Sequence, residues 1–102
     1  MIIFQNNIIY SNGGSAIDLP RGARTVVANN VFFDHTGSWQ GGVTTNYSSD
    51  DHTITRNIFI RNSYGVYSLT DNNLVYNNTF VDNAKGIYGT LSDTAENNIL
   101  IN

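Results

Sequence analysis

The chain has 102 residues and a formal net charge of −3, and only 13% of its residues are charged. This length fits one domain, and the weakly acidic balance does not support a surface for nucleic acid. Cysteine is absent, which excludes disulfides and thiolate metal sites, and no apolar run approaches the ~20 residues that a membrane-spanning helix needs. We therefore expect one domain over residues 1–102, with neither nucleic acid nor a membrane as a partner.

In chain order, short apolar segments alternate with turns rich in asparagine, of which the sequence has 16. Asparagine disfavours helices and suits turns, so this mixture predicts many short strands. The last segment of each repeat is a mostly apolar triplet that directly follows an asparagine. The triplets are residues 8–10, 31–33, 58–60, 79–81 and 99–101, and the preceding asparagines are Asn7, Asn30, Asn57, Asn78 and Asn98.

Two further series recur with the same step. An apolar residue lies three positions before each of these asparagines, at Phe4, Val27, Ile54, Val75 and Ala95. A small residue followed by Ile or Val begins another segment at residues 16–17, 42–43, 65–66 and 86–87. The asparagines are 23, 27, 21 and 20 residues apart. Such intervals fit three strands of about three to five residues, with three turns, in each repeat.

The repeats predict an all-β fold, a right-handed parallel β-helix with three sheets and about four to five coils. Strands of successive coils pair in parallel at ~4.8 Å, so equivalent residues stack, and stacked asparagines can form a hydrogen-bonded ladder. The right hand follows from the strong preference of parallel β connections. Leucine-rich repeats would need more leucine and propeller blades longer repeats, whereas an antiparallel sandwich remains as an alternative.

The motif Ile-x-x-Asn-x-Phe, followed by Gly-Val or Gly-Ile, is most complete at residues 54–59 with 65–66 and at residues 75–80 with 86–87. It resembles the parallel β-helix repeats of the pectin-lyase-like superfamily. It is also similar to the asparagine-rich repeats of carbohydrate-binding and sugar-hydrolase domains and of NosD-like periplasmic proteins. The resemblance covers nearly the whole chain, and it specifies the fold better than an activity.

The resemblance implies an extracellular or periplasmic location, but residues 1–7 lack the features of a signal peptide, so the compartment stays open. Complete members of such families are usually several coils longer and capped, and this chain shows no obvious caps. Because a solenoid needs protected ends, we expect either a longer parent protein or a partner that covers the ends.

In the similar lyases, epimerases and hydrolases, the site lies on the outer face of the first sheet, which here begins at the small-residue steps. If the Ile and Val of these steps face inward, strand alternation turns Asp18, Thr44, Tyr67 and Tyr88 outward. Tyr67 and Tyr88 would then form a stacking platform for sugar rings. The alternative is that all four are ordinary solvent-facing strand residues.

The coil that contains Asn30 is the longest, and its extra residues fall at positions 20–24 and 34–42. Long loops on a regular scaffold often carry function. His35 could act there as a general acid or base, with Asp18 as a second weak catalytic candidate, and Trp39 could be a wall for sugar stacking. The alternative reading makes His35 and Trp39 surface and packing residues.

Asp50 and Asp51 form a polar run with His52, and Asp71 and Asp93 lie near the corresponding turn of later coils. A stacked acidic edge could bind Ca²⁺ through oxygen ligands. However, aspartate also populates turns for backbone reasons, which is our preferred interpretation. We therefore expect no cofactor.

Sugar hydrolysis needs two carboxylates about 5–10 Å apart, and the predicted outer face offers only Asp18. We therefore favour a non-catalytic β-helix module that binds carbohydrate or a protein partner. The alternative is a fragment or minimal form of a polysaccharide lyase, epimerase or glycoside hydrolase that acts on an acidic polysaccharide.

The triplets of the third strands are apolar on both faces, which is typical of strands that are covered on both sides. If the middle residues point inward, the outward set includes Val31, Phe33, Ile58, Ile60, Val81, Ile99 and Ile101. We expect homo-oligomers that form through this third sheet or through the open solenoid ends, because two-fold dimers are the commonest assemblies. The alternative is that a further part of a longer chain covers the sheet.

Overall fold

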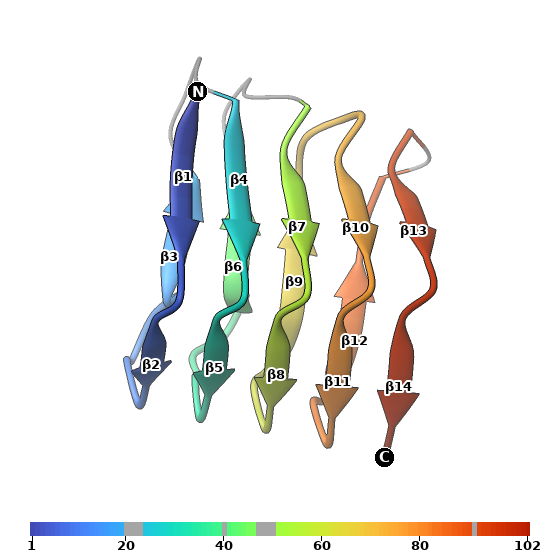
Figure 1. The fold of residues 1–102 in the computed structure, drawn as a ribbon. Helices are drawn as coiled ribbons and strands as arrows, with labels where there is room; N and C mark the ends of the chain where they lie inside the picture. The colour runs from blue at the N-terminus through green and yellow to red at the C-terminus, as the bar shows by residue number, and fades with distance from the viewer. Residues whose placement is uncertain (20–23, 40, 47–50, 91) are drawn as a thin grey trace.

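The computed structural model describes residues 1–19, 24–39, 41–46, 51–90 and 92–102. The described residues form strands joined by turns, arranged as three parallel sheets (Figure 1). The first sheet contains β12 (Lys85–Tyr88), β9 (Tyr64–Ser68), β6 (Gly41–Thr45) and β3 (Ile17–Leu19). The second sheet contains β1 (Ile2–Gln5), β4 (Thr25–Ala28), β7 (Thr53–Thr55), β10 (Leu74–Tyr76) and β13 (Thr94–Glu96). The third sheet contains β14 (Ile99–Ile101), β11 (Thr79–Val81), β8 (Ile58–Ile60), β5 (Val31–Phe33) and β2 (Ile8–Tyr10).

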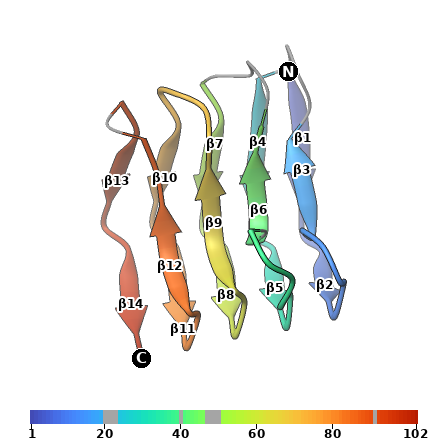
Figure 2. The same cartoon turned by 180° about the vertical axis from the view of Figure 1, so that it is seen from behind.

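The chain winds through the three sheets in a fixed order, so that each coil contributes one strand to each sheet in turn. Figure 1 shows the second sheet in front with the third sheet below it, and Figure 2 shows the first sheet from behind. This arrangement confirms the predicted architecture of a three-sheet solenoid. Among the described residues, no helix is long and apolar enough to cross a membrane.

Equivalent residues of successive coils stack in register, as the repeat predicted. Phe32 pairs with Phe59, and Phe59 pairs with Phe80, along the third sheet. The rings of these three side chains are stacked, with centroids 5.1 Å and 4.8 Å apart. All three are buried, and Val43 and Val66 of the first sheet are fully buried beside them. The middle residues of the triplets therefore face the core, and the flanking residues face outward.

The small residue before each Val or Ile makes room for the phenylalanine column. A Cβ atom added at Gly65 would overlap the ring of Phe80 and the carbonyl oxygen of Gly86. A larger residue at this position would push the first sheet away from the third, so the recurring glycine reflects packing rather than a turn.

The predicted asparagine ladder runs along the corner between the second and third sheets. Asn57 is representative: its backbone N–H and its Nδ2 both donate to Oδ1 of Asn78, at 2.9 Å and 3.1 Å. Its Nδ2 also donates to the carbonyl oxygen of Val27 at 2.9 Å. This first ladder consists of Asn7, Asn30, Asn57, Asn78 and Asn98. Each amide satisfies backbone groups at a corner where strand pairing stops, which is why a buried polar residue recurs there.

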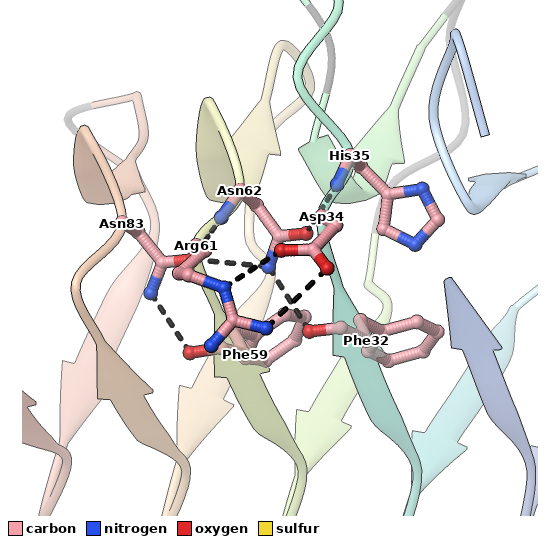
Figure 3. Close-up of polar contacts among 7 residues, drawn as sticks. All are labelled: Phe32, Asp34, His35, Phe59, Arg61, Asn62 and Asn83. Carbon is pink, nitrogen blue, oxygen red and sulfur yellow. Dashed lines mark hydrogen bonds and ion pairs between the residues drawn. The ribbon is translucent and has the colours of Figure 1, made fainter. Parts of the chain in front are cut away.

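A second ladder, which the sequence analysis missed, follows the corner between the third and first sheets (Figure 3). Its members are His35, Asn62 and Asn83. The backbone N–H of His35 donates to Oδ1 of Asn62 at 3.1 Å, and that of Asn62 donates to Oδ1 of Asn83 at 2.9 Å. Nδ2 of Asn62 donates to the carbonyl oxygen of Phe32, and Nδ2 of Asn83 to that of Phe59.

A third column occupies the remaining corner, just before the strands of the second sheet. The backbone N–H of Thr25 donates to Nδ1 of His52, His52 N–H donates to Oδ1 of Asn73, and Asn73 N–H donates to Oδ1 of Asp93. All three corners of the solenoid are thus held by side chains that accept a hydrogen bond from the neighbouring coil.

Candidate functional site

The outer face of the first sheet carries the column that the sequence predicted. Asp18 pairs with Thr44, Thr44 with Tyr67, and Tyr67 with Tyr88. Val43 and Val66 on the same strands are fully buried in the core. Strand alternation therefore places the four column residues as expected.

A third tyrosine, Tyr64, joins Tyr67 and Tyr88 on this face. The ring centroids of Tyr64 and Tyr67 lie 4.6 Å apart, those of Tyr67 and Tyr88 5.2 Å, and those of Tyr64 and Tyr88 5.9 Å. We call these three residues the aromatic shelf. Simple alternation would have put Tyr64 on the inner face. Gly65 and Val66 both face the core, and this pair of inward positions returns Tyr64 to the outer face.

The three rings of the aromatic shelf differ in their access to solvent. Tyr64 and Tyr67 are only 8% and 9% exposed, whereas Tyr88 is 45% exposed. Burial, followed by the neighbouring phenols of Tyr64 and Tyr88, raises the pKa of Tyr67 above its ordinary value of 10.0. Tyr67 thus remains a neutral phenol, and Tyr88 presents its ring to solvent on a support of two packed tyrosines.

Lys85 and Trp39 extend the aromatic shelf. Nζ of Lys85 lies 5.6 Å from the ring centroid of Tyr64 and 5.5 Å from that of Tyr88, which is within the range of a cation–π contact. A cleft of about 340 Å³ beside them is lined by Ser38, Trp39, Ser63, Tyr64, Ala84 and Lys85. Trp39 is 70% exposed. The loop of residues 34–39 therefore brings a second accessible aromatic side chain next to the shelf.

The family model described as a right-handed beta helix region matches residues 1–102. The chain belongs to this right-handed β-helix family. No curated protein and no solved structure gave a significant match. The family match agrees with the three-sheet solenoid, and it names no ligand or reaction.

In this right-handed β-helix, Thr44 lies next to Tyr67 on the side away from Tyr88, and Asp18 lies one strand further along the sheet. The hydroxyl of Thr44 shares a 2.6 Å hydrogen bond with that of Ser15, and Thr44 is buried although it faces outward. Asp18 is exposed, three strands from Tyr88, or about 14 Å at the usual strand spacing. The structure brings Tyr67 and Tyr88 into contact and places Trp39 on a cleft that Tyr64 and Lys85 also line, whereas Asp18 lies apart from these residues.

His35 is not a residue of the loop surface. It is fully buried, and its Nε2 lies 3.1 Å from the carbonyl oxygen of Ile9. This contact corresponds to those that Asn62 and Asn83 make in the second ladder (Figure 3). A surface-bound substrate could not reach this ring, so the structure gives no support to an acid or base role.

The acidic edge of the β-helix is dispersed. Asp50 lies outside the described residues. Asp51 and Asp71 are exposed, and Asp51 lies 3.9 Å from Nη2 of Arg24. Asp93 accepts hydrogen bonds from Asn73 N–H and Thr90 N–H. Within the described ranges, no group of three acidic, histidine or cysteine side chains could hold a metal ion.

The outward side chains of the third sheet form an apolar face. Its members, half-buried or exposed, are Val31, Phe33, Ile58, Ile60, Val81, Ile99 and Ile101. One edge of this face carries an ion pair in which Nε of Arg61 donates to Oδ1 of Asp34 at 2.8 Å (Figure 3). This hydrogen bond lowers the pKa of Asp34 below its ordinary value.

Proposed function

We propose that this β-helix is a non-catalytic module that binds carbohydrate on the aromatic shelf and Trp39. The observation that carries the proposal is the exposed ring of Tyr88, supported by Tyr64 and Tyr67, beside a cleft that Trp39 and Lys85 line. Sugar rings have apolar faces, and a fixed aromatic surface with a polar tip contacts both their C–H groups and hydroxyls. A packed support also limits the entropy that Tyr88 loses when a ligand binds.

The few acidic and basic side chains on the outer face of the first sheet support carbohydrate binding rather than catalysis. The column has one carboxylate, Asp18, whereas glycoside hydrolysis uses two that flank the scissile bond. His35, the other catalytic candidate, lies buried in the second ladder.

The test is a glycan array followed by calorimetric titration of the oligosaccharides that bind. Tyr88→Ala and Trp39→Ala should each weaken binding about fivefold, because an aromatic stacking contact is worth roughly 1 kcal/mol beyond area burial. Tyr10→Ala is the matched control, since Tyr10 is an exposed tyrosine on the third sheet. Equal losses in all three variants would contradict the proposal. Depolymerisation of an acidic polysaccharide that Asp18→Ala abolishes would replace it with an enzymatic function.

Self-association through the third sheet is a second proposal, favoured by the exposed apolar side chains there. Ile58 lies at the centre of the outward face, on the middle strand β8. Sedimentation velocity should detect a dimer that Ile58→Lys dissociates and that Leu69→Lys, at an exposed position outside the strands, leaves intact. A monomer at micromolar concentration, in the unmodified chain, would rule out this association.

A further inference from the structure

Asn12 occupies a ladder position without taking part in the ladder. It lies two residues after Tyr10, as His35 follows Phe33 and Asn62 follows Ile60, and these preceding residues are paired in register. Nδ1 of His35, which corresponds to the ladder acceptor, has no hydrogen-bond partner. Asn12 itself is exposed. The second ladder therefore stops at His35, and the amide of Asn12 is turned to solvent.

Asn12 is also the only asparagine in the sequence that glycine follows. In such a pair the backbone nitrogen of the glycine can attack Cγ of the asparagine and expel ammonia, which gives a cyclic succinimide. Water then opens the ring to aspartate or isoaspartate. Glycine offers the least steric resistance to this attack because it has no Cβ, and nothing lies within 4 Å of the Cβ position of Gly13.

The ladder asparagines are protected from the same reaction. Asn62 is followed by the small residue Ser63, but it is buried, and its Oδ1 accepts a hydrogen bond from His35 N–H. Its Nδ2 donates to the carbonyl oxygen of Phe32 and to Oδ1 of Asn83. Cyclisation at Asn62 would have to break all these bonds in a buried corner. The members of the first ladder are followed by Ile, Val or Thr, whose branched Cβ obstructs the attack.

The turn that contains Asn12 contacts the loop that contains Trp39. A Cβ atom at Gly37 would overlap the carbonyl oxygen of Gly13, so the two backbones touch at this point. Isoaspartate lengthens the main chain by one methylene group directly before Gly13. A displaced carbonyl would no longer fit against Gly37, so the loop of residues 34–39 is the neighbouring segment that a longer turn would move.

We propose that Asn12 is a site of spontaneous deamidation, and that its isoaspartate product shifts the loop that carries Trp39. The modification does not depend on carbohydrate binding. A resulting loss of ligand affinity rests on the proposed function and would identify the turn of residues 11–14 as a point where ageing weakens the binding face.

The first experiment incubates the folded chain at mildly alkaline pH and follows each asparagine by peptide mass spectrometry with detection of isoaspartate. The peptide with Asn12 should gain the mass of an acid in place of an amide, while the peptide with Asn62 remains unchanged. In denaturant, Asn62 should become reactive. Gly13→Ala should slow the reaction at Asn12. An unmodified Asn12, or equal reaction at Asn12 and Asn62 in the folded chain, would overturn the assignment.

The second experiment uses Trp39, the only tryptophan of the chain, as a reporter. Aged protein should differ from fresh protein in tryptophan emission and in quenching by acrylamide. Asn12→Asp introduces the charge without the longer backbone, so it should behave like fresh protein. Identical emission in aged and fresh samples would overturn the link to Trp39 and leave both the deamidation and the proposed carbohydrate binding untouched.

Discussion

Left-handed backbone at single residues lets the chain turn sharply before each ladder asparagine. Asn6, Asn29, Arg56, Asn77 and Asn97 all have φ between 52° and 62°. Asparagine adopts this conformation at a lower energetic cost than arginine does, which explains the paired asparagines of the sequence and makes Arg56 the exception.

Replacing Arg56 by asparagine should therefore stabilise the protein by about 0.5–1 kcal/mol, because an ordinary side chain in this conformation costs about 1 kcal/mol. Urea unfolding measures the difference. Asn77→Arg is the reciprocal control at the equivalent turn of the next coil and should lose a similar amount. If both variants unfold like the parent chain, residue type at this position does not matter.

His35 and His52 act in their columns as asparagine does elsewhere. In His35, Nε2 takes the place of the amide nitrogen that contacts a carbonyl oxygen of the preceding coil. In His52, Nδ1 takes the place of the accepting oxygen. Geometry of the corner, rather than chemistry on a substrate, accounts for both residues.

His35→Asn should therefore keep most of the stability, to within about 1 kcal/mol. His35→Ala should lose about 2–4 kcal/mol, because it leaves a void and unpaired backbone groups. Chemical denaturation of the two variants provides the comparison. Equal losses would contradict the equivalence of histidine and asparagine at this position.

At the level of whole strands, the sequence predicts those features that every coil repeats. The triplets, the first ladder and the glycine before Val66 recur because stacked positions share one environment. The second and third columns cannot be recognised from the sequence, because His35, His52 and Asp93 replace asparagine there and interrupt the repeat of asparagines. Tyr64 was missed because Gly65 and Val66 face inward in succession, so alternation alone gives the wrong face.

The packing of β9 against β12 makes a prediction about alkaline pH. The pKa of Tyr67 is raised by burial, so the folded state disfavours the phenolate. The unfolded chain ionises first, and stability is fully present below pH ~10 and falls as the pH rises above it. Tyr67→Phe removes this ionisable group, and its unfolding free energy should fall less over the same pH range. A parallel pH dependence in both proteins would show that other groups dominate.

At the scale of the whole molecule, protection should decrease from the central coils toward the ends of this chain. Phe59 and Leu100 occupy the same column of the third sheet, but Phe59 is fully buried and Leu100 is 60% exposed. A solenoid is stabilised by contacts between neighbouring coils, so a terminal coil has one such interface and a central coil has two. Local opening therefore requires less free energy at β13 and β14 than at β7 and β8. Amide hydrogen exchange should be about 100-fold slower at Phe59 than at Leu100, and the two should converge in denaturant. Uniform protection along the column would mean that the coils open only together, as one cooperative unit.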